Sequence, residues 1–241
     1  MKLTAADLRN VVQHLPKDVR KHLSRNGSNL YVGGGFIRAI VAGEKPSDID
    51  MFGDTKERLN RVSAYLQQDR TGSKTHITSN AITLLSPERM PVQFITRWLF
   101  NTSQDLVSSF DFTVCQAVVF YNKDTKNWDS QVGEGFYTDL AARRLVYTFP
   151  VREEEAGGSM LRVMKYTRRG YNIQIDSLSG VMARVTAAVN NLLVDTAKNM
   201  TGEKEISTIT KTLLREVDPL MVIDGLDFVD DHETDTESEN F

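Results

Sequence analysis

Two short segments of this 241-residue chain carry residues whose types and spacing are appropriate for phosphate and metal chemistry. Gly33, Gly34 and Gly35 stand together before an apolar stretch, and Asp48 and Asp50 follow at alternate positions of a predicted strand. Glycines allow backbone N–H groups to approach a phosphate, and a following helix directs its positive end toward it. Alternate strand side chains share a face about 7 Å apart, so the two carboxylates can bind the same divalent cations. Together the two segments predict a site for nucleotidyl transfer.

Each segment has an ordinary interpretation when it is taken alone. An Asp-X-Asp pair is common at solvated strand ends, and a run of glycines is more often a loop. The order of the two segments, with a helical stretch at 36–41 between them, is more specific and favours the functional interpretation. A dinucleotide-binding fingerprint is a poor rival, because residues 33–35 lack the Gly-X-Gly-X-X-Gly spacing.

The elements that must position these residues change in character along the chain. β-Forming runs predict strands at 30–32, 47–52, 75–78, 81–85, 92–98 and 112–121, with a turn at 122–127. Helix starts are predicted at Thr4, Pro16, Asp54 and Ser103, and three further helices at 158–169, 176–198 and 203–217. We therefore expect an α+β fold with a mixed β-sheet flanked by helices in residues 1–152. A helical neck in residues 153–223 and an acidic disordered tail at 224–241 are expected to follow.

Composition excludes several other classes of protein. The net charge of −3 is uneven, because residues 224–241 hold eight acidic side chains and no Lys or Arg, which leaves the rest of the chain positive. A single cysteine excludes an internal disulfide and a cysteine-rich zinc site, and the four histidines show no metal-ligand spacing. No apolar run approaches the length of a membrane span, and the charged N-terminal segment is unlike a secretory signal. We expect a cytoplasmic protein without a membrane partner, and the sequence does not indicate an oligomeric state.

Basic side chains supply candidates for nucleotide binding. Arg143 lies near the end of the predicted head, and Arg162 and Lys165 share one face of the first neck helix. That face binds triphosphate or RNA backbone in one interpretation and is an ordinary solvated face in the other. Tyr166 and Tyr171 either stack on a base or, as we favour, pack in the core of the neck.

The two segments and two later motifs resemble the polymerase-β-like nucleotidyltransferase superfamily, most closely the head and neck of the class II CCA-adding enzyme and poly(A) polymerase family. That family's Gly-Gly-X-X-Arg…Asp-X-Asp motif is matched by Gly34, Gly35, Arg38, Asp48 and Asp50. Its Arg-Arg-Asp-Phe-Thr-X-Asn-Ala motif is matched in part by residues 109–117, and its neck motif by residues 161–173. The resemblance covers roughly residues 28–175.

The resemblance implies an enzyme that moves a nucleoside monophosphate from a nucleoside triphosphate to a hydroxyl acceptor. For this reaction we expect Mg²⁺ or Mn²⁺ as the cofactor, with two ions that are held by Asp48 and Asp50 with help from Asp111, bridge the phosphates and lower the pKa of the attacking hydroxyl. The resemblance also implies that Arg38 reaches the β- or γ-phosphate, and the ordinary interpretation is a solvated arginine on a helix surface. The implied acceptor is the 3′ end of an RNA resembling transfer RNA, with a small molecule or a protein side chain as open alternatives.

The sequence departs from the family at several positions. The family has a carboxylate on the strand before its second motif, where this chain has Gln93, and its paired arginines are replaced by Ser109 and Phe110. Asp111 is then the best third carboxylate, although its place in the motif also allows a ribose or backbone contact. These departures support a second hypothesis, a catalytically degenerate nucleotidyltransferase that acts as a nucleotide-binding or protein-interaction module.

Overall fold

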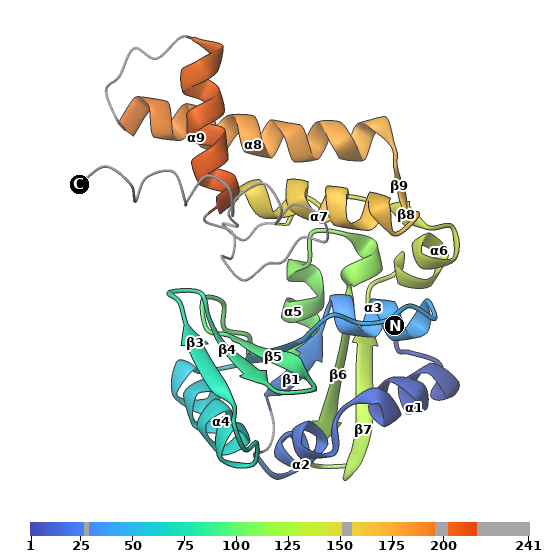
Figure 1. Ribbon diagram of the computed structural model, residues 1–241. Coiled ribbons are helices and arrows are strands. Elements are labelled where there is room, and N and C mark those ends of the chain that lie inside the picture. Colours follow the sequence, from blue (N-terminus) through green and yellow to red (C-terminus); the bar gives the residue numbers. More distant parts are fainter. Residues whose placement is uncertain (27–28, 151–155, 196–201, 216–241) are drawn as a thin grey trace, which may run out of the picture. The chain divides into compact units, whose positions relative to one another are not determined.

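The computed structural model describes residues 1–26, 29–150, 156–195 and 202–215 (Figure 1). The chain divides into two units, Met1–Ala142 and Arg143–Phe241, whereas the sequence placed this boundary at residue 152. Residues 143–145 belong to the second unit because Arg144 and Leu145 pair in parallel with Asn172 and Ile173. The predicted acidic tail at 224–241 lies outside the described residues, so its disorder stays a prediction.

A seven-stranded sheet forms the centre of the first unit, in the order β3-β4-β5-β2-β1-β6-β7 (Figure 1). Every neighbouring pair is antiparallel except β2 and β5, which are parallel. The strands are β1 (Leu30–Gly33), β2 (Ile49–Gly53), β3 (Lys74–Ile77), β4 (Ala81–Ser86), β5 (Arg89–Ile95), β6 (Ala117–Asn122) and β7 (Asn127–Val132). The sheet is therefore mixed, and the predicted α+β class is confirmed.

Helices surround this sheet, and threonine side chains begin several of them. Thr4, Thr55 and Thr102 each accept a hydrogen bond from a backbone N–H of the first turn. Asp54, which was expected to cap the third of the predicted helices, instead pairs with Arg58 at 2.6 Å. The helices are α1 (Ala5–His14), α2 (Lys17–Asn26), α3 (Gly35–Val41), α4 (Lys56–Gln68), α5 (Ser103–Ser109) and α6 (Phe136–Ala141).

The two faces of the sheet are covered by different segments. A Cβ atom on Gly53 would lie 3.1 Å from Cδ2 of Leu59 in α4, and one on Gly33 would lie 2.9 Å from Cζ of Phe110, the residue after α5. Gly33 pairs directly with Asp50, so both point to the same face. Asp50 and Gly53 are three positions apart on one strand and point to opposite faces. Thus α4 packs on one face, and Phe110 packs on the face that carries Asp50.

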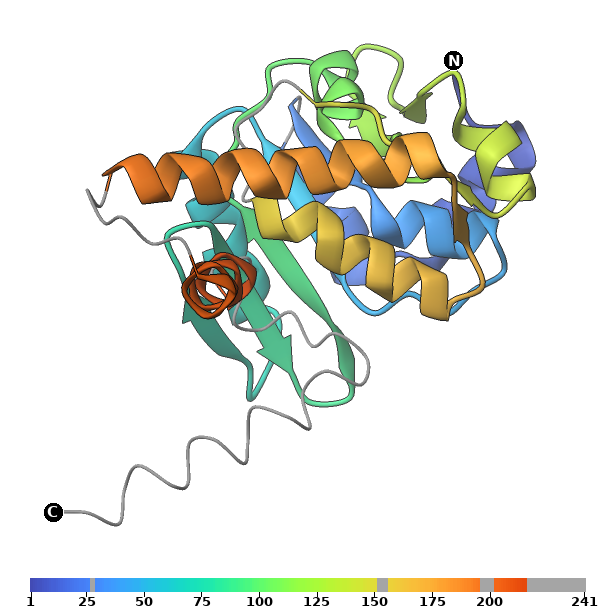
Figure 2. The same ribbon diagram turned by 90° about the horizontal axis from the view of Figure 1, so that it is seen from above.

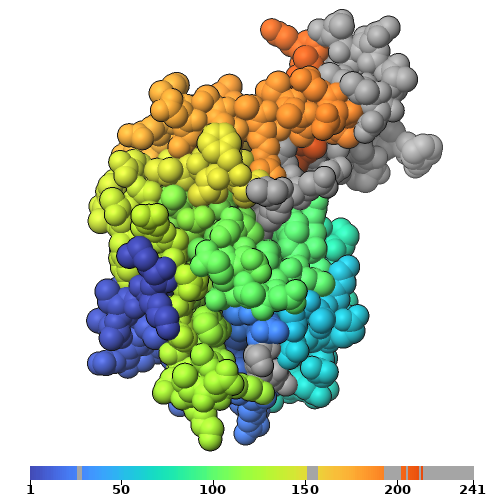
Figure 3. Space-filling view, turned by 180° about the vertical axis from the view of Figure 1, so that it is seen from behind, coloured from blue at the N-terminus to red at the C-terminus, as the bar shows by residue number. Residues whose placement is uncertain are grey.

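The segment after α5 differs from the sequence prediction. A strand was expected over 112–121, but Thr113–Cys115 forms a 3₁₀ turn and only Ala117–Asn122 is extended. The turn is held by a hydrogen bond from the Thr113 hydroxyl to Asp139 Oδ2 at 2.6 Å. The predicted turn at 122–127 is followed by β7, which the sequence did not indicate. The N-terminal segment lies beside β7 (Figure 3), where Met1 and Val132 exchange backbone hydrogen bonds.

The second unit is mainly helical, as the sequence predicted for the neck. Helices α7 (Ala156–Arg168) and α8 (Ile175–Asp195) lie side by side (Figure 2), and α9 (Glu203–Arg215) contacts both of them. A short parallel pair joins β8 (Arg144–Leu145) to β9 (Asn172–Ile173). Tyr166 and Tyr171 are buried together with their rings 5.9 Å apart, which confirms the core interpretation of these tyrosines. In the described part of the chain, no helix combines the length and apolar composition needed to cross a bilayer.

An ion pair inside the first unit ties α2 to the segment after α4 and to β5. The fully buried Arg70 side chain donates from Nε to Asp18 Oδ2 at 2.8 Å and from Nη1 to the Met90 carbonyl at 3.3 Å. Burial alone would raise the pKa of Asp18, but the hydrogen bond and charge of Arg70, together with Arg89, hold that pKa below its usual value. The ionised Asp18 carboxylate therefore stabilises the fold.

We predict that Asp18→Asn lowers the free energy of unfolding at pH 7 by about 3 kcal/mol, because it leaves the buried Arg70 charge without its partner. The folded pKa of Asp18 is depressed, so this stability is present above its ordinary value of 3.8 and is lost as the pH falls through the folded pKa. Urea unfolding between pH 3 and pH 7 should show the two proteins converging at the acid end. A constant difference across that range would contradict the prediction.

Candidate functional site

Asp50, one of the two predicted carboxylates, lies on the central strand β2, and the pairing of that strand determines its neighbours. Asp50 pairs with Gly33 of β1 on one side and with Gln93 of β5 on the other. The row continues from Gln93 to Thr83 of β4. Directly paired residues point to the same face of a sheet. The structure therefore brings together the first glycine, the second aspartate and the glutamine that stands where the resembled family has a carboxylate.

Asp48 precedes β2 by one residue and is half-buried. Its Oδ1 accepts a hydrogen bond of 2.5 Å from the hydroxyl of Ser47. Ile49 and Met51 are completely buried, whereas Asp48 and Asp50 are both partly exposed. This alternation agrees with the prediction that the two aspartates share one face and the apolar residues enter the core.

The glycines meet a requirement of packing that sequence reasoning missed. Gly34 has φ 73° and ψ −129°, a conformation that residues with a Cβ rarely adopt. Its N–H donates to the carbonyl of Ala117 at 3.0 Å, so this group is used within the fold rather than directed at a ligand. A Cβ on Gly34 would lie 3.1 Å from Cε1 of Phe110. The glycines thus allow the Phe110 ring to approach the end of β1.

Phe110 belongs to a group of aromatic rings beside Asp50. Phe52 lies two positions after Asp50, on the same face of β2. Its ring packs edge to face against Phe110 with centroids 5.8 Å apart and against Phe100 with centroids 6.1 Å apart. One signal was available in the sequence, because Phe110 occupies a position where the resembled family has arginine. The aspartates are therefore bordered on one side by an apolar wall.

Asp111 was predicted as the third metal ligand, and the structure places it next to Phe110 with 1% of its surface exposed. Among the described residues, no group of three or more His, Cys, Asp or Glu side chains is arranged to hold a metal ion. The structure thus does not assemble the three predicted ligands into one cluster, and the role of Asp111 stays a prediction. Asp48 and Asp50 remain as a pair of partly exposed carboxylates. Such a pair is compatible with Mg²⁺, which is commonly bound by one or two carboxylates together with substrate phosphates.

Arg38 lies inside α3 rather than on its surface. The side chain is buried, and Nη1 pairs with Glu44 Oε2 at 2.6 Å. This ion pair connects α3 to the loop that leads to Asp48. The predicted contact of Arg38 with a phosphate is not tested by this arrangement, and the observed contact assigns the side chain a role in holding that loop.

The other predicted nucleotide-binding cations belong to the second unit. Arg143 donates from Nη1 to the carbonyl of Arg169, just beyond the end of α7, at 3.0 Å, and its guanidinium lies 5.4 Å from the ring centre of Tyr171. A cation at a helix C-terminus also interacts favourably with the helix dipole. Arg162 and Lys165 lie on α7 and are partly exposed. Nucleotide binding by these three side chains stays a prediction.

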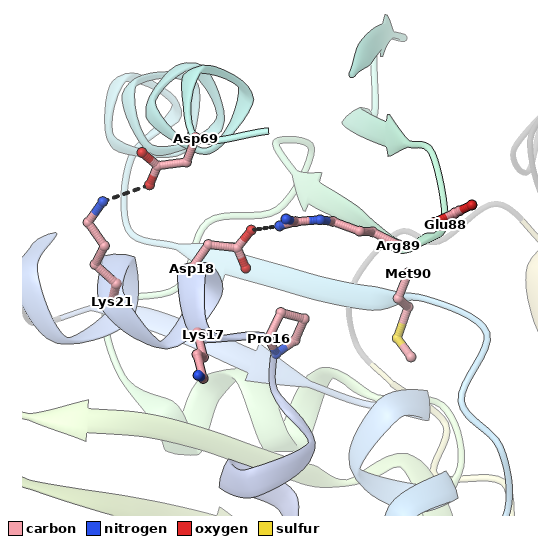
Figure 4. Close-up of a pocket in the computed structure, with 8 residues that line it drawn as sticks. All are labelled: Pro16, Lys17, Asp18, Lys21, Asp69, Glu88, Arg89 and Met90. Carbon is pink, nitrogen blue, oxygen red and sulfur yellow. Dashed lines mark hydrogen bonds and ion pairs between the residues drawn. The ribbon is translucent and has the colours of Figure 1, made fainter. Parts of the chain in front are cut away.

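A separate open hollow of about 710 Å³ lies between the start of α2, the end of α4 and the β4–β5 turn (Figure 4). Its charged side chains are largely paired with one another, since Asp18 contacts Arg89 at 2.9 Å and Asp69 contacts Lys21 at 2.8 Å. None of the predicted site residues lines it. Because these charges are paired with one another, we interpret the hollow as a place where structural elements are held together by ion pairs. We therefore place the candidate site at Asp48 and Asp50.

Comparison with solved structures identifies the class of fold. A Thermotoga maritima CCA-adding enzyme complexed with tRNA has a TM-score of 0.54 and 16% identity, over 90% of this chain and 55% of that one. A CCA-adding enzyme complexed with ATP has a TM-score of 0.56 and 15% identity, over 85% of this chain and 52% of that one. The chain thus has the polymerase-β-like nucleotidyltransferase fold of the head and neck of these enzymes, and it spans about half of their length.

Comparison of sequences identifies the family. The model of the Gabija anti-defense 2 family matches residues 2–143, more than half of the chain, and the chain belongs to that family. A curated relative, Gabija anti-defense 2 of Bacillus phage SPbetaL7, is 25% identical over 166 residues. The match covers 66% of this chain and 38% of the relative, so the chain spans well under half of that protein.

We predict that Gly34→Ala lowers the free energy of unfolding by about 2–3 kcal/mol, through its backbone conformation and its contact with Phe110. Gly43→Ala is the matched control, because Gly43 also has a positive φ of 70° but no described atom lies within 4 Å of a Cβ placed there. We expect the control to lose about 1 kcal/mol in the same urea titration. Equal losses would mean that the Phe110 contact adds no constraint.

Tyr31 pairs with Phe52 on the face of the sheet that carries Asp50, and it makes the stability of the protein depend on pH in the alkaline range. Burial first, and then the charges of Asp54 and Asp105, raise the pKa of its hydroxyl to about 12. The unfolded state therefore ionises first, and this contribution to stability falls as the pH rises from 10 through about 12. We predict that Tyr31→Phe shows a shallower loss of stability over this range in urea unfolding. Parallel curves for the two proteins would contradict the assignment.

Proposed function

We propose that this protein is a metal-dependent nucleotidyltransferase that moves a nucleoside monophosphate from a nucleoside triphosphate to a hydroxyl acceptor. The observation that carries the proposal is the position of two partly exposed carboxylates, Asp50 paired to Gly33 on the central strand β2 and Asp48 just before that strand, in a nucleotidyltransferase fold. The ATP complex of a CCA-adding enzyme with this fold supports a triphosphate as the donor. Mg²⁺ or Mn²⁺ is the proposed cofactor.

The chemistry follows from the two carboxylates. In the proposed reaction the acceptor oxygen forms a bond to the α-phosphorus, the bond from that phosphorus to the β-phosphate oxygen breaks, and the acceptor proton passes to water. A bound divalent cation would offset the charge that develops on the leaving pyrophosphate. Asp48 and Asp50 are the residues that would hold such a cation, and the wall of Phe52 and Phe110 would limit water on one side. Arg38, Arg143, Arg162 and Lys165 are the proposed further contacts to the nucleotide.

The acceptor is proposed on weaker grounds than the donor. The tRNA complex of the Thermotoga maritima enzyme supports the 3′ end of an RNA, although this chain spans about half of that enzyme. The family description adds a setting, the countering of a defence named Gabija. A small molecule or a protein side chain is the alternative acceptor. We propose that the reaction takes place in the cytoplasm, where both the triphosphate and such acceptors are present.

A second candidate is a nucleotidyltransferase fold that binds nucleotide or protein without transfer. The replacement of a family carboxylate by Gln93 favours it, as does the packing of Phe110 where the family has arginine. The retained pair Asp48 and Asp50 favours the enzyme. The two candidates differ in whether a nucleotide is transferred from the triphosphate to an acceptor.

We predict that the protein, incubated with Mg²⁺ or Mn²⁺, total RNA and each α-labelled triphosphate in turn, transfers label to RNA. Asp48→Asn and Asp50→Asn should each lower the rate at least about 100-fold with the fold retained, because a neutral amide holds the cation poorly. Asp124→Asn, in the exposed β6–β7 turn, is the matched control and should keep the full rate.

Each other outcome has a definite meaning. Label on protein in place of RNA would change the acceptor but keep the class of reaction. Binding of triphosphate without transfer to any acceptor would support the non-enzymatic candidate. Full turnover by both aspartate variants would contradict the proposed mechanism.

A further inference from the structure

The pairing of Asp50 with Gln93 bears on how many cations the site can hold, which the proposed function alone does not specify. Gln93 is the direct partner of Asp50 across the only parallel strand pair in the seven-stranded sheet. Neighbouring strands are about 4.8 Å apart, so Gln93 and Asp50 side chains rise beside one another from the same face. Val92 and Phe94 on either side are completely buried, which prevents β5 from turning Gln93 away.

Gln93 is the cross-strand residue best placed to add a ligand to the Asp48 and Asp50 pair. On the other side of Asp50 stands Gly33, which has no side chain, and the Phe110 ring packs over it. Beyond Gln93 the next residue in the row is Thr83, a further strand away. The identity of residue 93 therefore sets how many carboxylates the sheet can present to a cation.

We propose that Gln93 limits this site to one tightly held divalent cation, so that the triphosphate brings its cation to Asp48 and Asp50 and no second cation is held for the acceptor hydroxyl. This inference rests on the proposed function. An amide is neutral, and affinity for hard cations increases with the number of charged oxygen ligands. Asp48 and Asp50 together offset one dication, and a second dication beside it would be repelled by the first and would gain no charged protein ligand at position 93. Slow transfer, with the acceptor oxygen losing its proton to water, is the expected consequence.

The substitution Gln93→Glu tests this directly, because it keeps the size of the side chain and adds the missing charge. We expect the full-length wild-type chain to bind a non-hydrolysable ATP analogue with one Mn²⁺ per bound analogue, measured from the electron paramagnetic resonance signal of the free ion and compared with the analogue alone. Gln93→Glu should bind a second Mn²⁺, with a dissociation constant at least about tenfold lower than any second binding by wild type. Adding Asp50→Asn to Gln93→Glu should abolish the gain.

Gln131→Glu is the matched control. Gln131 lies in the same cross-sheet row, on β7, because it pairs with Val118, which in turn pairs with Gly33. It is three strands from Asp50, about 14 Å away, so the same added charge is too distant to share a cation. This variant should bind Mn²⁺ as wild type does.

The outcomes separate this inference from the proposed function. If wild type binds two Mn²⁺ ions, or if Gln93→Glu binds no better than Gln131→Glu, the role of Gln93 is refuted while the transferase stands. If neither wild type nor Gln93→Glu binds the analogue with its Mn²⁺, the metal site itself is refuted, and the proposed function and this inference are both contradicted.

Discussion

The structure of the candidate site depends on the burial of Ile49 and Met51 in the central strand β2. Both side chains are completely buried, and the residues between and before them are carboxylates. A slip of one residue would place Asp50 in the core and an apolar side chain on the exposed face, at the cost of a buried charge. That penalty fixes the register in which Asp50 pairs with Gly33 and Gln93.

Two positions of the first unit bear on how the charge of a triphosphate would be offset. Arg38 pairs with Glu44 inside α3, and the position where the resembled family has arginine is the aromatic Phe110. Under the proposed function, a cation held by Asp48 and Asp50 would then offset much of the charge of a triphosphate. This places an unusual demand on Asp48 and Asp50, and it makes the neutral residue at position 93 more consequential.

Local patterns predicted much of the fold. The alternation at 47–52, the glycines before α3 and the helical spacing after residue 156 correspond to β2, to the β1–α3 junction and to the helices of the second unit. The strand predicted over 112–121 is confirmed only from Ala117; before it, Thr113–Cys115 forms a 3₁₀ turn whose Thr113 hydroxyl donates a hydrogen bond to Asp139. That contact joins residues 26 positions apart, so no local propensity reveals it.

By itself, the sequence determined the class of fold and the identity of the carboxylate pair, because both depend on residue types repeated at short spacing. Only the tertiary structure decided what stands beside that pair. It placed Gln93 next to Asp50, packed Phe110 against Gly34, and buried Arg38 against Glu44. These outcomes depend on the order and register of strands and on packing between distant segments, and a linear pattern contains neither.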